Sequence, residues 1–215
     1  ATGANLWKAE RPEAWHSWSS PQIIAAADLH ELIVSGSKKL DAYAPTSGEQ
    51  LWTVSGLTQE CIPTPVFAHG LLYAVSGPNG NHIAIRPGGR GDVTETHVVW
   101  KYRRGTSFVP SAIIIDDRYY LADDKGFARC WEIPSGKILW RQRLKGKYTA
   151  SPVAADGKLF FVNETGTTLV LDATSRDYVE LSRNDIDEDV LSSPAVSHAC
   201  FFLRTSKHLV CIGNE

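Results

Sequence analysis

The sequence predicts an all-β fold in which one small antiparallel sheet is repeated along the chain. Five prolines recur at intervals of 44, 45, 42 and 42 residues, and all but the third follow Ser or Thr: Pro21, Pro65, Pro110, Pro152 and Pro194. A second motif, Gly-x-x-Leu-Trp, ends at Trp7, Trp52 and Trp140, and Trp100 holds the same place in a longer unit. Between these marks, apolar residues alternate or form short runs bounded by Gly, Asp, Asn or Ser, which is the pattern of strands.

The clearest copy of the unit starts at Ser151-Pro152. Asp156-Gly157 is a strong signal for a two-residue hairpin turn. The segments around it are rich in β-forming residues. The strands expected here cover residues 153–155, 158–163, 168–172 and 178–182. The unit is therefore predicted to be four short antiparallel strands joined by tight polar turns.

The other units follow the same plan. After Pro21 we expect strands over residues 23–27, 31–35, 40–43 and 50–54, and after Pro110 over residues 112–115, 119–123, 127–132 and 138–144. The unit after Pro65 carries a longer loop, residues 86–96, which contains Gly88, Gly89 and Gly91. The last unit has only three strands, residues 195–197, 200–204 and 208–212.

Four-stranded sheets repeated at this period are typical of a β-propeller. We expect a single propeller domain over residues 1–215, with five repeats of which the first and last are incomplete. The expected blades are residues 18–57, 62–105, 108–146, 149–184, and 191–215 plus 1–8. Either the two chain ends pair and close a five-bladed ring, or the chain is an arc of a larger propeller. We favour the arc, because the chain contains no Met and begins with the tail of a unit.

The repeated Gly and Trp have a mechanical interpretation. A Trp ring on an outer strand can pack against the adjoining blade and bury about 150–250 Å². The Gly in the preceding turn allows a positive φ and a close approach of backbones. The residues expected to dock the blades are Trp7, Gly48, Trp52, Trp100, Gly136 and Trp140.

Composition excludes several classes of function. The net charge of −2 argues against nucleic acid as the main partner. The longest apolar stretches are too short for a transmembrane segment. The four cysteines, Cys61, Cys130, Cys200 and Cys211, lack Cys-x-x-Cys spacing. Cys200 and Cys211 fall on consecutive predicted strands, so a disulfide is one alternative, and free apolar thiols are the favoured one.

The units resemble the PQQ-like (quinoprotein-type) propeller repeat. The resemblance rests on residues 40–43 with 47–52, residues 130–133 with 135–140, and residues 169–174. Residues 83–97 and 204–212 look like bacterial PQQ-like propeller proteins related to outer-membrane-assembly lipoproteins. This resemblance implies a C-terminal portion of an exported protein about twice as long, with a periplasmic or otherwise extracytoplasmic location.

The family also contains enzymes, so a PQQ- and calcium-dependent oxidoreductase is the alternative function. By resemblance, such an enzyme needs a pocket floored by Trp, a calcium site of Glu, Asn and Asp oxygens, an Asp base and commonly a vicinal disulfide. The chain has no Cys-Cys pair, and Trp131 is the one Trp that suits a central pocket. The acidic run over residues 185–189 lacks the Gly and Glu of a calcium loop. We therefore expect no catalytic, cofactor-binding or metal-ligating residues.

The favoured function is a non-enzymatic scaffold of the cell envelope that binds a protein or peptide partner. Loops on a rigid scaffold are where binding residues usually lie. The long loop supplies the candidate contact residues Arg86, Arg90, Asp92 and His97. A carbohydrate-active or sensor module of a larger envelope protein is a third alternative.

Overall fold

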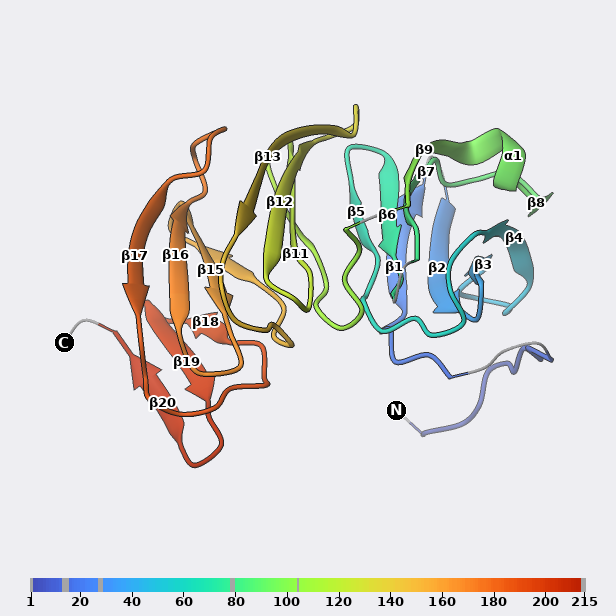
Figure 1. Ribbon diagram of the computed structural model, residues 1–215. Helices are drawn as coiled ribbons and strands as arrows, with labels where there is room; N and C mark the ends of the chain where they lie inside the picture. Colours follow the sequence, from blue (N-terminus) through green and yellow to red (C-terminus); the bar gives the residue numbers. More distant parts are fainter. Residues whose placement is uncertain (1, 13–15, 27–28, 78–79, 104, 214–215) are drawn as a thin grey trace. The chain divides into compact units, whose positions relative to one another are not determined.

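A computed structural model describes residues 2–12, 16–26, 29–77, 80–103 and 105–213 (Figure 1). Residues 1, 13–15, 27–28, 78–79, 104 and 214–215, several of which fall inside the predicted blades, lie outside the described residues. The described chain is built from short strands with one helical turn. It divides into two compact units, Ala1–Thr106 and Ser107–Glu215. That all the sheets belong to one domain stays a prediction.

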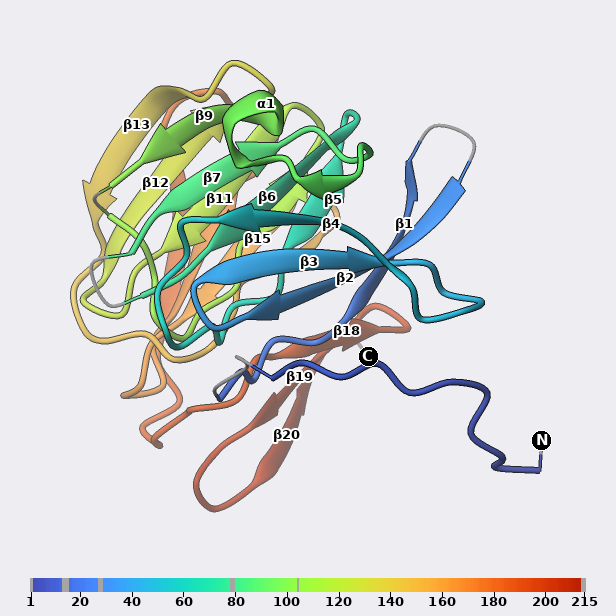
Figure 2. The same ribbon diagram turned by 90° about the vertical axis from the view of Figure 1, so that its right-hand side faces the viewer.

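The first unit contains two sheets. One has the order β1-β2-β3-β4-β8 and the other the order β5-β6-β7-β9 (Figures 1 and 2). The strands of the first sheet are β1 (Gln22–Ala26), β2 (Leu29–Gly36), β3 (Lys39–Tyr43), β4 (Gln50–Ser55) and β8 (Gly91–Asp92). Those of the second are β5 (Val66–Ala68), β6 (Leu71–Val75), β7 (His82–Ile85) and β9 (Val98–Tyr102), with the short helix α1 (Thr94–His97) before β9.

The second unit contains three antiparallel sheets, each with its strands in sequence order. The first is β10 (Ile113–Ile115), β11 (Arg118–Ala122), β12 (Phe127–Glu132) and β13 (Lys137–Arg143). The second is β14 (Val153–Ala155), β15 (Lys158–Val162), β16 (Thr168–Asp172) and β17 (Glu180–Asn184). The third has only β18 (Ala195–Ser197), β19 (Cys200–Arg204) and β20 (Leu209–Ile212).

These sheets confirm the predicted fold class. The expected strands over residues 127–132, 153–155 and 168–172 match β12, β14 and β16 residue for residue. The turn predicted at Asp156-Gly157 joins β14 to β15, with φ of 49° and 67° at its two residues. Such a turn needs positive φ, which Gly and Asp tolerate.

The start of the chain differs from the expectation. Residues 2–10 contain no strand, although residues 1–8 were expected to supply one to the last blade. The Trp7 indole lies on the turn between β3 and β4, where it donates a hydrogen bond to the Pro45 carbonyl (2.9 Å). A Cβ on Gly48 would come within 2.4 Å of the ring, so only Gly fits under it. This contact holds the segment beside the first sheet. Pairing of the chain ends stays a prediction.

Apolar side chains from neighbouring sheets pack together in buried clusters within each unit. In the first unit, a buried cluster joins residues of β3 and β4 to residues of β6 and β7. In the second, another joins β11 and β12 to β15 and β16, and a smaller cluster brings Val162 to Leu203 of β19. Each sheet thus buries a face against its neighbour, which is how repeat folds obtain their stability.

A β-bulge recurs at the same place in four sheets. The pairing skips one residue of the outer strand: Leu51 in β4, Val99 in β9, Leu139 in β13 and Leu181 in β17. In the first three sheets, the residue after the skipped one is the repeated Trp. A bulge changes the direction in which the side chains of its strand point. Accordingly, Leu139 and Trp140, although consecutive, pack against the same core cluster.

The Ser or Thr before three of the repeated prolines links neighbouring sheets. The Thr64 hydroxyl accepts a hydrogen bond from the Ser20 N–H (3.2 Å). Ser151 accepts one from the Ser111 N–H (2.9 Å), and Ser193 accepts one from the Ser151 N–H (2.9 Å). In each case the hydroxyl of one repeat accepts a hydrogen bond from a backbone N–H at the start of the preceding repeat. This structural use explains why these serines repeat with the sheets.

Replacing Ser151 with Ala should destabilise the protein by about 1 kcal/mol, because the part-buried Ser111 N–H loses its acceptor. Chemical denaturation monitored by circular dichroism measures this change. Ser182→Ala, at an exposed position of β17, is the matched control and should change stability by less than about 0.5 kcal/mol. Equal effects of the two substitutions would contradict a role for the inter-sheet bond.

Replacing Trp140 with Ala should cost about 3 kcal/mol. The Trp140 ring contacts Tyr120 of its own sheet and lies edge-on to Tyr178 of the next, with centroids 5.4 Å apart in the latter pair. Trp140→Phe keeps part of this contact and should lose less stability. Denaturation midpoints of the two variants provide the measurement. If the Phe variant were as unstable as the Ala variant, the apolar area that the ring buries against the next sheet would not be the source of the stabilisation.

Candidate functional site

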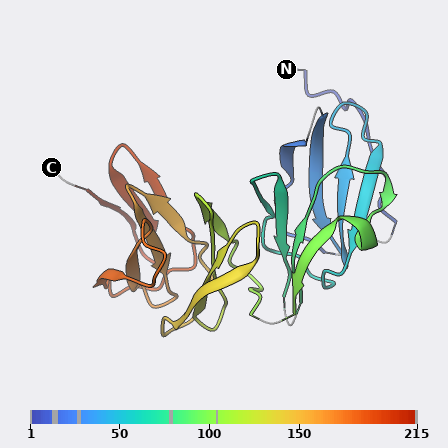
Figure 3. The ribbon, with the colours of Figure 1, turned by 90° about the horizontal axis from the view of Figure 1, so that it is seen from above.

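The 86–97 loop, which connects β7 to β9, lies against the neighbouring sheet. Its strand β8 pairs in parallel with the outer strand β4, with Trp52 opposite Gly91 and Thr53 opposite Asp92. Figure 3 shows this green segment beside the blue strands of the first sheet. An insertion in the second sheet's repeat thus covers the open edge of the first sheet, which otherwise exposes unpaired backbone groups.

Further contacts fix the middle of the loop. The Val93 N–H donates to the Thr53 carbonyl (3.0 Å), and the Val93 side chain is only 3% exposed. The Thr94 hydroxyl accepts a hydrogen bond from the Ser55 N–H (2.9 Å). Asp92 Oδ1 accepts bonds from the Thr94 hydroxyl and N–H, which lower the pKa of Asp92. The loop is therefore held in one conformation by its own polar groups and by β4.

Glu31 of β2 ties the beginning of the loop to the sheet. Its side chain is 2% exposed, and Oε2 accepts a hydrogen bond from the Trp52 indole (2.9 Å). The Gly88 N–H also donates to this carboxylate, and Arg90 and His97 lie close enough to interact with its charge. Burial nevertheless raises the pKa of Glu31, because the low-dielectric surroundings disfavour the charged form.

The four candidate contact residues occupy different parts of the loop. Arg86 and Arg90 are exposed, and Arg90 Nη1 donates to the Gly89 carbonyl (2.8 Å). The Arg86 N–H donates to the His97 carbonyl (2.9 Å), so these two residues meet where the loop begins and ends. The Asp92 side chain is exposed, and its carboxylate accepts hydrogen bonds from Thr94. Their role in binding a partner stays a prediction.

Sequence reasoning missed Glu31. It lies in the predicted strand 31–35 at the same parity as Ile33, and Ile33 is fully buried. Alternation therefore places Glu31 on an apolar face, which is an unusual position for a carboxylate. A carboxylate at a position expected to be buried could therefore have predicted that polar groups cover this end of the sheet.

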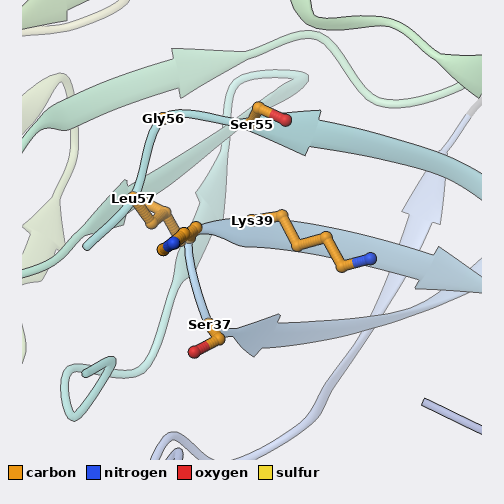
Figure 4. Close-up of a pocket in the computed structure, with 6 residues that line it drawn as sticks. Ser37, Lys39, Ser55, Gly56 and Leu57 are labelled. Atoms are coloured by element: carbon orange, nitrogen blue, oxygen red, sulfur yellow. The ribbon is translucent and has the colours of Figure 1, made fainter. Parts of the chain in front are cut away.

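A pocket of about 700 Å³, here called the lysine pocket, opens next to the loop. It is lined by Ser37, Lys38, Lys39, Ser55, Gly56 and Leu57 (Figure 4). The Lys101 amine of β9 lies beside it, 3.2 Å from the position that a Cβ on Gly56 would take. Ser55 connects the pocket to the loop through its bond with Thr94. Cationic and hydroxyl groups therefore surround a hollow beside the 86–97 loop.

The described part of the chain has no arrangement that matches a metal site. No group of three or more His, Cys, Asp or Glu side chains within it could hold a metal ion. In the acidic run, Asp185 accepts from the Thr167 hydroxyl and Glu188 from the Thr205 hydroxyl. Trp131 is 1% exposed, and its ring lies edge-on to Tyr119 at 5.4 Å, so it forms core rather than the floor of a cofactor pocket. Trp131 therefore does not fit a PQQ site.

Among the described residues, the structure has no helix with the length and hydropathy needed to cross a bilayer.

Comparison with known proteins identifies the family. A family model described as "Outer membrane protein assembly factor BamB" matches residues 1–114 and 92–179. The chain belongs to this family. The match confirms the predicted PQQ-like propeller relationship. Comparison with curated protein sequences found no match.

Solved structures show the same fold. BamB from Moraxella catarrhalis superposes with a TM-score of 0.72 at 15% identity, over 97% of this chain and 63% of BamB. The computationally designed Ika8 protein superposes with a TM-score of 0.67 at 13% identity, over 89% of this chain and 57% of that chain. This chain therefore spans less than two thirds of the length of these relatives. At such low identity, the likeness establishes the β-propeller fold alone.

Replacing Glu31 with Gln should change how stability depends on pH. The raised pKa means that the folded protein holds this proton at pH values where the unfolded chain, near the ordinary value of 4.5, has lost it. The free energy of unfolding of the wild type should therefore fall as the pH rises from below 4.5 through the raised pKa. Glu31→Gln should lack this fall and gain stability relative to wild type over that window.

Denaturation midpoints measured between acid and neutral pH test this expectation. Glu49→Gln, at an exposed position in the β3–β4 turn, is the matched control. A Gln variant that loses stability relative to wild type as the pH rises would show that the ionised carboxylate is a net stabiliser of the loop.

Proposed function

We propose that this protein is a non-catalytic scaffold of the bacterial cell envelope that binds protein or peptide partners on the periplasmic side. The observation that carries the proposal is membership of a family described by an outer membrane protein assembly factor. An extracytoplasmic location is part of the same proposal.

The contact surface in this proposal is the 86–97 loop together with the lysine pocket. Backbone pairing with β4 and the Glu31 contacts hold the loop rigidly. A surface that is ordered before binding loses little conformational entropy when a partner docks. Functional residues are commonly presented in this way, on loops fixed by a rigid scaffold.

The partner chemistry that suits this surface is an extended segment rich in Asp and Glu. Lys38, Arg90 and Lys101 are exposed cations of the pocket and loop, whereas the whole chain carries a net charge of −2. Lys38 lines the pocket and the Lys101 amine lies beside it, so two cations meet at this hollow. Charge complementarity of this kind steers encounter and selects partners.

Site-specific photo-crosslinking tests the scaffold role. A photoreactive residue placed at Arg90 or Lys38 should capture envelope proteins in intact cells. The same residue at Lys158, in the hairpin between β14 and β15, serves as the matched control and should capture few or none. Equal capture at all three positions, or no capture at the first two, would contradict the proposed surface.

Charge reversal tests the partner chemistry. A fluorescent Glu-rich peptide should bind the protein, and Lys38→Glu with Lys101→Glu should weaken that binding about tenfold. Lys137→Glu and Lys158→Glu, both in the second unit, form the control pair. Binding should also weaken with added salt. A Lys-rich peptide that binds equally well would reject the acidic-segment proposal while leaving the scaffold role in place.

A further inference from the structure

Two cysteines lie on the same face of the last sheet. Cys211 of β20 is opposite Phe202 of β19, and Cys200 lies two residues before Phe202. Side chains two residues apart on a strand share a face. Cys200 and Cys211 are therefore diagonal neighbours across the β19–β20 pair.

The position opposite Cys200 is held by Gly213. A Cβ at that position would come within 2.9 Å of Cys200 Sγ, so a larger residue would crowd the thiol. Gly213 therefore leaves room for the Cys200 sulfur beside its own backbone. The Cys211 thiol in fact shares a hydrogen bond with the Cys200 thiol, which raises the pKa of Cys211. Both groups are thiols in this structure.

Exposure separates this pair from the other two cysteines. Cys211 is exposed and Cys200 is half-buried, whereas Cys61 and Cys130 are fully buried. Burial raises the pKa of Cys61 to about 11 and that of Cys130 to about 12. An oxidant can reach the pair on the last sheet, whereas burial keeps it away from Cys61 and Cys130.

We propose that Cys200 and Cys211 are a modification site: they form an intrachain disulfide by exchange with a disulfide-bearing oxidant. The Cys211 thiolate attacks one sulfur of the oxidant's disulfide, forms a mixed disulfide and releases the other sulfur as a thiolate. The Cys200 thiolate then attacks Cys211 Sγ and expels the second oxidant sulfur. The two cysteines lose two protons and two electrons, and the oxidant disulfide becomes two thiols.

The disulfide would link β19 to β20, the last of the three strands that the described residues give this sheet. Leu209 and Ile212 of β20 are 75% and 53% exposed, so burial of apolar surface contributes little to holding this strand. A covalent link between β19 and β20 would replace that missing contribution. Secreted and envelope proteins commonly use disulfides in this way where the core is small.

The test uses the wild-type chain and oxidised glutathione. After incubation in a glutathione redox buffer, free thiols are alkylated and the protein is digested with trypsin without reduction. Cleavage after Arg183, Arg204 and Lys207 separates the two cysteines, so the disulfide should appear as peptide 184–204 linked to peptide 208–215. The intact protein should lose two hydrogens, and the two remaining thiols should react only after unfolding.

Two single variants serve as controls. Cys200→Ser and Cys211→Ser each remove one partner, so the remaining cysteine should end as a mixed disulfide with glutathione. Several results on the wild type would overturn the proposal: two alkylatable thiols at positions 200 and 211 under oxidising conditions, stable glutathione adducts at these positions, or a disulfide between two copies of the chain.

Discussion

The contact between the outer strand of one sheet and the body of the next is the interaction on which this fold depends. A sheet of four short strands cannot bury both of its faces alone, so each must be covered by a neighbour. The recurrent bulge provides the geometry for this. It removes one residue from the pairing immediately before Trp52, Trp100 and Trp140, so that the outer strand bends at the indole. In β17 the bulge remains, but Ser182 stands where the indole would be.

A second, polar contact acts alongside the indoles. A backbone N–H of the preceding repeat donates to the hydroxyl of Thr64, Ser151 or Ser193. The Pro that follows each of these residues has no N–H that needs a partner. The Ser-Pro or Thr-Pro pair is thus suited to the position where one sheet begins beside the preceding sheet. Apolar packing supplies most of the stabilisation, and these directional bonds define the alignment of neighbouring sheets.

The sequence was sufficient to predict the repeat, most strand positions and the hairpin at Asp156-Gly157, because all of these depend on local patterns that recur. It was not sufficient for the parallel pairing of β8 with β4. That contact joins Trp52 to Gly91 across a long stretch of chain, and two residues of strand carry no periodicity that could reveal it. The lysine pocket was missed for the same reason, since Lys38 and Gly56 become neighbours only through folding.

The 86–97 loop shows what an insertion can do in a repeat fold. A loop added to one repeat is positioned by the scaffold to reach its neighbour, so its first effect is on the adjoining sheet. Here Val93 enters the apolar core that the two sheets of this unit share, and Gly88 completes the hydrogen bonding of Glu31. The residues left exposed, such as Arg90, are then displayed from a segment whose backbone is already fixed. Structural anchoring and partner binding are therefore compatible in one loop, because they use different residues of the same backbone.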